Sequence, residues 1–289
     1  MIDLHVHTIH SDGKYTASEI LKIAESKNIR NISFCDHDKL GAYDEIKKLD
    51  VKNIFSGKII PGIEFSFAYK KKVFHMLGYN FNIDKLKKSK FIDRRSQKEL
   101  IECEEKKLIF FKDVCKKLNI KLSPNLKIHT QNEQANDIIK EDMQKYEENG
   151  DILDELLGKN REISFWRGHV TNPESPFFID LSTNLPSAID IANEIHNAGG
   201  IVVLPHVFEY KTVDNKEFLN DMFKLGILDG IECVHSKHNL EQVQYLKEFC
   251  KNKDLLMSGG SDFHNDKNQI LGYTQLGPID DIYCLKKCE

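Results

Sequence analysis

Residues 2–13 read IDLHVHTIHSDG, a short apolar run that leads into histidines and then into a turn. Alternate residues of a strand point to the same side, so a strand over residues 2–6 would direct His5 and His7 toward one point. The Asp12-Gly13 turn that follows can bring a carboxylate back to the same place. Imidazole and carboxylate groups gathered in this way are typical of a metal site.

Six further apolar runs are predicted strands; they cover residues 32–35, 59–63, 73–77, 201–204, 230–234 and 255–258. Most of them lack an alternating pattern, which favours strands buried on both faces, as in a parallel sheet. Helical patterns lie between several of the strands, and Thr16, Ser187 and Asn239 are predicted to cap three of these helices. Strands that alternate with helices indicate an α/β fold, and seven of them favour a closed or nearly closed barrel.

The middle of the chain has a different pattern. Apolar residues at helical spacing predict one long helix over about 100–118, and further helices are expected within 134–148 and 151–157. A proline-containing loop then leads back to the last predicted strands. We therefore expect a helical insertion over residues 95–185 and a discontinuous α/β domain made of residues 1–94 and 186–289.

Composition limits the classes of function. The net charge is −4 and the pI is about 6.3, so no extended basic face is expected and a long nucleic-acid duplex is excluded as a partner. A small anionic substrate is compatible with this net charge, because bound metal ions create local positive charge. No membrane span or signal peptide is recognisable, and the seven cysteines are scattered, so a cytoplasmic location with reduced thiols is expected.

The candidate ligands share one position, at or just after the end of a predicted strand. They are His5, His7, Asp12, His37, Glu64, His75, His206, Asp262 and His264. In a β/α barrel these strand ends converge on one face. A single histidine there would be an ordinary core or surface residue, but the joint pattern favours a metal site. With roughly three to four protein ligands per ion, two or three divalent ions are expected. The histidines favour Mn, Fe or Zn over Mg.

Several motifs resemble those of the PHP (polymerase and histidinol phosphatase) superfamily. They are DLHVHT at 3–8, SDG at 11–13, DHD at 36–38, PGIE at 61–64, HMLGY at 75–79, AGG at 198–200, LPH at 204–206 and GGSDFH at 259–264. The resemblance implies a distorted (β/α)7 TIM-like barrel with two or three metal ions that hydrolyses phosphate esters. The most similar type acts on nucleoside 3′,5′-bisphosphates and short 5′-phosphorylated oligonucleotides, and it carries an inserted helical domain, which we expect to cover the active site.

The resemblance also implies roles for individual residues. One ion would be held by His5, His7, Glu64 and Asp262, a second by Asp12, His37 and His75, and a third by Glu64, His206 and His264. Arg94 and Arg95 before the insertion helix, and His235 and His238 after the sixth strand, are candidates for substrate binding. A phosphatase of the histidinol phosphatase type, a metal-dependent amidase and a non-catalytic metalloprotein that senses a phosphorylated ligand remain alternatives.

Overall fold

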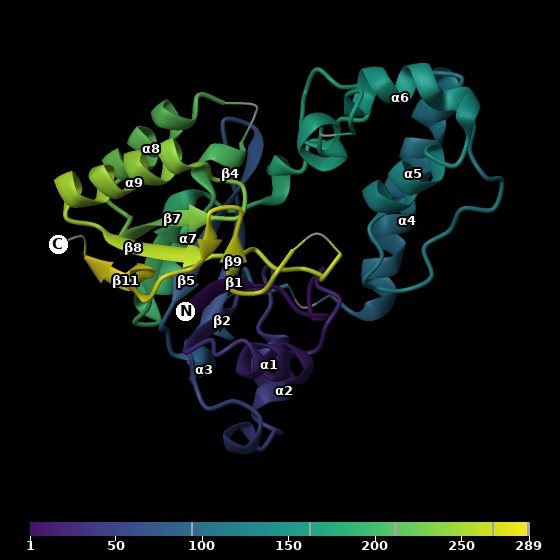
Figure 1. Cartoon of the computed structure of the whole chain (residues 1–289). Coiled ribbons are helices and arrows are strands. Elements are labelled where there is room, and N and C mark those ends of the chain that lie inside the picture. The colour runs from purple at the N-terminus through teal and green to yellow at the C-terminus, as the bar shows by residue number, and fades with distance from the viewer. Residues whose placement is uncertain (94, 162, 211–212, 268, 288–289) are drawn as a thin grey trace. The chain divides into compact units, whose positions relative to one another are not determined.

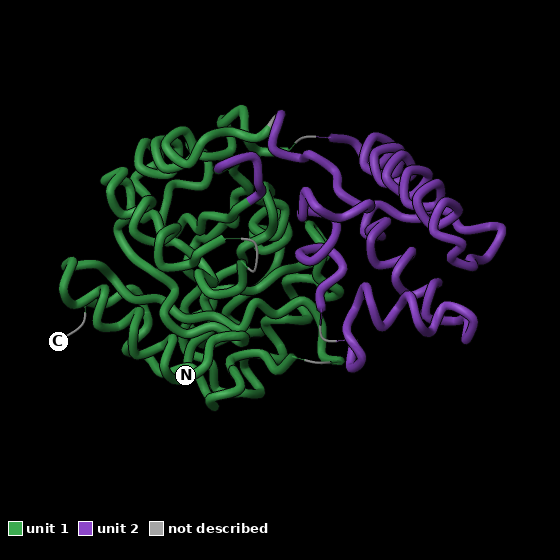
Figure 2. The backbone as a smooth tube through the Cα atoms, turned by 90° about the horizontal axis from the view of Figure 1, so that it is seen from above, with its two compact units in different colours: residues 1–69, 74–93, 185–289 green, residues 70–73, 94–184 purple. Residues whose placement is uncertain are grey.

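The computed structural model describes residues 1–93, 95–161, 163–210, 213–267 and 269–287, which fall into two compact units. The first unit comprises residues 1–69, 74–93 and 185–289, and the second comprises residues 70–73 and 94–184 (Figure 2). Each unit has its own hydrophobic core. Separate cores are the mark of separately packed folding units.

The strands of the first unit form two main sheets (Figure 1). One has the order β1 (Ile2–Val6), β2 (Asn31–Phe34), β3 (Lys58–Ile59), and its pairs are parallel. The other has the order β11-β8-β7-β6-β5-β4. Its strands are β4 (Gly62–Tyr69), β5 (Lys72–Tyr79), β6 (Ile201–Leu204), β7 (Gly230–His235), β8 (Leu256–Gly260) and β11 (Cys284–Lys287). Two isolated parallel bridges join segments of the two sheets: Val6, at the end of β1, pairs with Phe263 after β8, and His37, after β2, pairs with Glu64 in β4.

Two predictions about the strands are wrong. The strand expected over 59–63 is two strands, because β3 ends at Ile59 and β4 begins at Gly62. Pro61 lies in the gap, and proline cannot donate to a sheet ladder. The sheet is also mixed rather than parallel, since β5 runs antiparallel to β6 and β11 antiparallel to β8. Only Lys70 and Lys71 separate β4 from β5, and both have positive φ, which suits a tight hairpin and leaves no room for a crossover helix.

The helices of the first unit are α1 (Ala17–Ser26), α2 (Gly41–Ile46), α3 (Ile83–Leu86), α7 (Ala188–Asn197), α8 (Asn215–Lys224) and α9 (Leu240–Lys253). The three predicted N-caps are confirmed. Thr16, Ser187 and Asn239 each accept a hydrogen bond from the backbone N–H three residues on, and the side chain at that position returns a bond to the cap. α7 packs on β4 and β6, and α9 packs on β7 and β8. Short elements complete the unit: η1 (Val51–Asn53), η5 (Val207–Glu209), η6 (Asp281–Tyr283), β9 (Tyr273–Thr274) and β10 (Gly277–Pro278), whereas η4 (Ser182–Asn184) belongs to the second unit.

The second unit is helical, with α4 (Gln97–Lys117), α5 (Ala135–Met143), η2 (Glu147–Asn149), α6 (Gly150–Leu157) and a π-helical turn η3 (Trp166–Val170). The long predicted helix is confirmed, and it begins earlier than expected because Ser96 and Glu99 form a capping box. Phe111, Ile139, Leu157 and Phe177 lie at the centre of its core. Throughout the described residues of both units, no helix has the length and apolarity that crossing a membrane would need.

Candidate metal centre

The ends of β1 and β8 position the first two histidines. His5 lies in β1 and His7 just after it, both fully buried, and their ring centroids are 5.2 Å apart. Gly260, at the end of β8, allows the strands to approach this closely, because a Cβ atom there would lie 2.2 Å from His5 Cβ. This confirms the close approach expected of the glycines in the GGSDFH motif. The packing of β8 against β1 therefore requires a residue without a side chain.

Glu64, in β4, is buried at the centre of the cluster and contacts five histidines. Its Oε2 atom lies 3.3 Å from His5 Nε2, 3.3 Å from His7 Nε2 and 3.2 Å from His37 Nδ1. Its Oε1 atom lies 3.1 Å from His75 Nδ1 and 2.9 Å from His206 Nε2. One carboxylate thus joins side chains from five different places in the chain.

Two more carboxylates complete the cluster. Asp262 Oδ1 lies 3.1 Å from His7 Nε2 and 3.5 Å from His5 Nε2. Asp12 Oδ2 lies 3.3 Å from His264 Nε2 and 3.6 Å from His37 Nε2. The structure therefore brings all nine predicted ligands together.

We name three ligand groups by these contacts. The first group is His5, His7, Glu64 and Asp262, whose ligand atoms lie within 4.8 Å of one another. The second group is Asp12, His37 and His264, with His7 also within reach. The third group is Glu64, His75 and His206. The first group has the expected membership. His264 was expected beside His206 but lies beside Asp12 and stacks on His7 at 4.2 Å. His75 also lies within reach of His37, as expected, because His37, Glu64 and His75 form a further group of close ligand atoms.

Unpaired buried atoms show that a cation fits this cluster. His5 Nε2, His7 Nε2, His37 Nδ1, His75 Nδ1, Asp12 Oδ1 and Glu64 Oε2 are buried and make no hydrogen bond. Buried polar atoms without partners are costly, and carboxylate oxygens cannot donate to imidazole lone pairs. A positive charge between them removes the conflict. The donor set of nitrogen and oxygen, without a thiolate, suits a divalent transition metal.

The shifted pKa values also indicate that the cluster attracts positive charge. Burial lowers the pKa of His5, but Glu232, Glu64 and Asp262 outweigh burial and raise that pKa well above its usual value. Burial raises the pKa of Asp12, but His264 and His37 outweigh it and hold that pKa well below its usual value. The carboxylates therefore stay ionised and attract positive charge, which protons or metal ions can supply.

Buried carboxylates outside the predicted set hold the ligand-bearing segments in place. Asp36 accepts hydrogen bonds from Thr8 N at 2.7 Å, Thr8 Oγ1 at 2.7 Å and Ser11 Oγ at 2.6 Å, which fixes the turn that carries Asp12. Asp3 accepts from Ser261 N at 2.9 Å and from Gly272 N at 2.7 Å. Sequence reasoning missed these two residues. The signal was present, because Asp3 shares a strand face with His5, and Asp36 directly precedes His37.

Asp38 and Glu232 are two further buried or partly buried carboxylates near the site. Asp38 Oδ1 accepts from the backbone N–H of Ser66 at 2.9 Å. Burial raises the pKa of Asp38 to about 6. Among these carboxylates, Glu232 is the one that bonds a ligand histidine, since its Oε1 atom lies 3.0 Å from His5 Nδ1.

The predicted substrate-binding residues fall into two sets. Arg94 lies outside the described residues, and Arg95 belongs to the second unit, where it donates to Cys103 Sγ at 3.6 Å. His235 and His238 are buried at the end of β7. His235 Nδ1 accepts from Lys237 N at 3.2 Å, and its Nε2 faces Asp262 Oδ2 at 3.4 Å. His238 Nδ1 donates to the carbonyl of Cys233 at 3.1 Å, which leaves the buried Nε2 as an unpaired acceptor.

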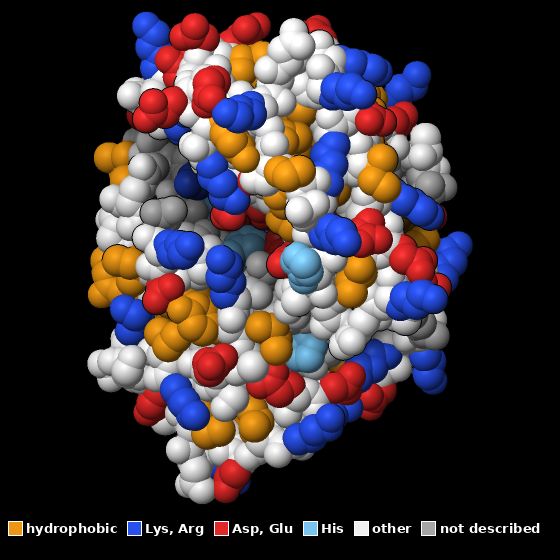
Figure 3. Space-filling model, turned by 90° about the vertical axis from the view of Figure 1, so that its right-hand side faces the viewer, with side chains coloured by type: hydrophobic (Ala, Val, Ile, Leu, Met, Phe, Trp, Pro, Cys, Tyr) orange, Lys and Arg blue, Asp and Glu red, His pale blue; other side chains and the backbone are white. Residues whose placement is uncertain are grey.

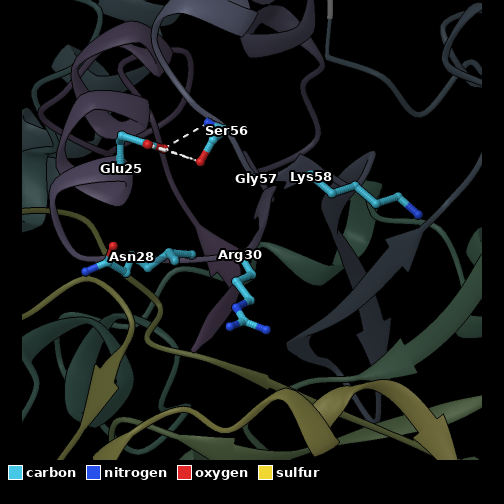
Figure 4. A pocket seen from close by; sticks show the side chains of 7 residues that line it. Glu25, Asn28, Arg30, Ser56, Gly57 and Lys58 are labelled. Atoms are coloured by element: carbon cyan, nitrogen blue, oxygen red, sulfur yellow. Dashed lines mark hydrogen bonds between the residues drawn. The ribbon is translucent and has the colours of Figure 1, made fainter.

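Histidine side chains and one cavity occur at the surface. Figure 3 shows histidine side chains reaching the surface beside acidic side chains. A separate cavity of about 540 Å³ is lined by Glu25, Asn28, Ile29, Arg30, Ser56, Gly57 and Lys58. It lies where β2 and β3 begin, and Figure 4 shows Arg30 and Lys58 pointing in different directions. It contains none of the nine ligands and does not belong to the metal centre.

Sequence similarity to known proteins extends over nearly the whole chain, although no family model matches it. A 5′-3′ exoribonuclease of Haemophilus influenzae is 26% identical over 97% of this chain and 94% of its own length. A phosphoribosyl 1,2-cyclic phosphate 1,2-diphosphodiesterase of Eggerthella lenta is 24% identical over 93% of this chain and 95% of its own.

Solved structures show the same fold. A crystal structure from Bifidobacterium adolescentis, named for a metal-dependent phosphoesterase, has a TM-score of 0.62 at 22% identity and covers 98% of this chain and 96% of its own. An amidohydrolase from Chromobacterium violaceum, with bound sulfate, has a TM-score of 0.67 at 19% identity and covers 97% of this chain and 92% of its own.

The fold, the ligand cluster and the sequence relatives agree with the motifs. The protein is a metal-dependent phosphoesterase, and this part of the sequence-based prediction is confirmed.

Proposed function

We propose that this phosphoesterase hydrolyses small phosphorylated nucleotides: the 5′ end of a short oligonucleotide, or a nucleoside bisphosphate. The observation that carries the chemistry is the set of buried imidazole and carboxylate atoms that converge without hydrogen-bond partners. The full-length similarity to an exoribonuclease supports the substrate class. The net charge of −4 favours a short substrate over a long duplex.

The three ligand groups would hold two or three divalent ions. The histidines favour Mn, Fe or Zn over Mg. When bound, such ions lower the pKa of water toward ~7 and stabilise negative charge on a phosphoryl group. The exposed fractions of the Asp12, His37 and His264 side chains are 25%, 27% and 25%, whereas those of His5, His7 and Glu64 are 0–1%. The second group is therefore the side from which a phosphate would approach.

The residues at the end of β7 have roles that follow from their hydrogen bonds. Because Lys237 N donates to His235 Nδ1, the proton of a neutral His235 lies on Nε2 and is directed at Asp262. His235 would thus orient a metal ligand rather than bind substrate. His238 presents an acceptor at Nε2 and would receive a hydroxyl or N–H group of the substrate. Phosphate contacts from Arg94 and Arg95 remain part of the proposal.

The domain architecture belongs to the same proposal. The isolated bridges between the two sheets favour a distorted (β/α)7 barrel, and the helical unit would be an insertion into it. A cytoplasmic location fits the scattered cysteines.

The test is a substrate panel with added Mn²⁺. A short RNA with a 5′ phosphate, the same RNA with a 5′ hydroxyl and a nucleoside 3′,5′-bisphosphate are incubated with the protein, and released mononucleotide and inorganic phosphate are measured. We expect release from the 5′-phosphorylated RNA or the bisphosphate, and its loss on adding a chelator. Absence of release from every nucleotide substrate by metal-loaded protein would overturn the proposal.

A second candidate activity is supported by the similarity to a cyclic phosphodiesterase. The panel therefore includes a phosphoribosyl 1,2-cyclic phosphate. Histidinol phosphate and an amide substrate test the two remaining alternatives. Preferential turnover of any of these three compounds would replace the nucleotide assignment.

A further inference from the structure

Glu232 lies within β7, is fully buried, and is not one of the nine predicted ligands. Its two carboxylate oxygens have different partners. Oε1 lies 3.0 Å from His5 Nδ1, and Oε2 accepts the backbone N–H of His206 at 2.8 Å. His5 belongs to the first ligand group and His206 to the third, so one side chain contacts members of both.

The bond to His5 determines which ring nitrogen is available. A carboxylate can only accept, so Nδ1 of His5 carries the hydrogen and Nε2 keeps its lone pair. That Nε2 atom lies 3.3 Å from Glu64 Oε2 and 3.5 Å from Asp262 Oδ1. Glu232 therefore holds His5 in the one neutral form that can bind an ion at the first group.

The bond to His206 acts on the backbone. His206 has φ 30° and ψ 47°, a left-handed conformation that residues other than glycine rarely adopt. By accepting the N–H of this residue, Glu232 fixes the peptide at the position where the strain is stored. In this conformation His206 Nε2 reaches Glu64 Oε1 at 2.9 Å, within the third group.

We propose that Glu232 is a shared positioning residue that aims one histidine at each of two ion positions, so that metal binding at both depends on a single carboxylate. This inference rests on the metal centre proposed above. The second group provides an internal reference, because among the described residues none of Asp12, His37 and His264 forms a hydrogen bond with Glu232.

The test is the substitution Glu232→Gln in the full chain. Glutamine has nearly the same shape but only one accepting oxygen. If its amide nitrogen faces His206 N, two donors oppose each other. If it faces His5 Nδ1, His5 must move its hydrogen to Nε2 and ceases to be a ligand. Loss of such an outer partner lowers metal affinity roughly 10–100-fold.

Cadmium NMR of protein titrated with Cd²⁺ distinguishes the positions, because each bound ion gives its own resonance. For Glu232→Gln we expect ~10–100-fold weaker binding at one of the two positions, the one whose histidine loses its accepting oxygen. Glu232→Ala, which removes both oxygens, should weaken the His5 position and the His206 position alike, with no change at the position formed by Asp12, His37 and His264. His5→Gln, which removes only one of the two contacts, assigns the first resonance. Glu248→Gln, an exposed substitution on α9, is the matched control and should leave all resonances unchanged.

Two results would overturn the inference. One is a Glu232→Ala protein in which either the His5 position or the His206 position keeps its wild-type affinity, or a Glu232→Gln protein in which both do. The other is an equal loss of Cd²⁺ affinity at all positions, which would indicate a general loss of structure. A lowered midpoint in thermal unfolding of the metal-free variant would identify such a loss. If wild-type protein bound no Cd²⁺ at all, the metal centre itself would be discarded, and this inference with it.

Discussion

Glu64→Gln is the substitution that tests the metal centre most directly. Glu64 belongs to both the first and the third ligand groups and lies 2.9–3.3 Å from five histidine nitrogens. The substitution preserves size but removes the charge and one accepting oxygen. The five histidines around Glu64 would then lose part of the negative charge that lies between them.

The expected magnitude follows from the number of ions affected. Removing an outer partner of a metal ligand costs roughly 10–100-fold in affinity, and a direct ligand should cost at least ~100-fold for each ion. Glu64 contributes to two positions, so the product of the two binding constants should fall by about 10⁴, or ~5.5 kcal/mol. For activity we expect kcat/KM to fall by roughly 10³ or more, which is ~4 kcal/mol of transition-state stabilisation.

Calorimetric titration with Mn²⁺ measures the affinities, and phosphate or nucleotide release measures the activity. Glu248→Gln is again the control, because this exposed glutamate on α9 lies outside the cluster. Thermal unfolding of the metal-free variants verifies that both are folded. If Glu64→Gln bound the same number of ions with unchanged affinity, the assignment of Glu64 as a shared ligand would be refuted.

Three further predictions concern stability. Gly260→Ala would place a Cβ atom 2.7 Å from the backbone nitrogen of His5, so we expect chemical denaturation to show a free energy of unfolding lower by about 1–3 kcal/mol. The control Gly150→Ala, whose Cβ would have no atom within 4 Å, should be neutral or slightly stabilising. Asp142→Asn should cost about 1–3 kcal/mol at neutral pH, because Asp142 accepts from Ser123 N and Oγ, both at 2.7 Å. Burial raises the pKa of Asp142, but hydrogen bonds from Ser123 and the charge of Lys145 outweigh burial and lower that pKa. The stabilisation is therefore present above the unfolded pKa of ~3.9 and is lost as pH falls through the folded pKa. Denaturation curves of the wild type and Asp142→Asn should converge in acid, and a difference that stays constant with pH would contradict the charge argument. Finally, Mn²⁺ at 100 times its Kd should stabilise the wild type by ~2.7 kcal/mol in thermal unfolding, and an unchanged midpoint after chelation would argue against a resident metal.

The sequence was sufficient for features that depend on neighbouring residues. The capping boxes at Thr16, Ser187 and Asn239 need only a residue and the one three positions later. The alternation of His5 and His7 likewise follows from strand geometry alone. The nine ligands could be named because each stands beside an apolar run.

Features that depend on spatial neighbours could not be predicted. Nothing near His264 in the sequence indicates that it lies beside Asp12 rather than His206, because that choice depends on how the loops after β1 and β8 pack. The partner of Asp3 could not be predicted for the same reason, since Ser261 is 258 residues away, although the position of Asp3 on the strand face of His5 was visible in the sequence. In the sequence alone, a buried carboxylate that holds two segments together cannot be distinguished from any other charged residue in a strand.

The bond between Asp3 and Ser261 also has a consequence for synthesis of the protein. The first strand leaves the ribosome long before its partner β8, whose Gly260 must pack against His5. The helical unit between them has its own core and can fold while the remainder is still being made. The ion-binding cluster is therefore assembled last, and a nascent chain that has not reached residue 264 has only part of it. Hydrolytic capacity should therefore appear only after residue 264 has been translated.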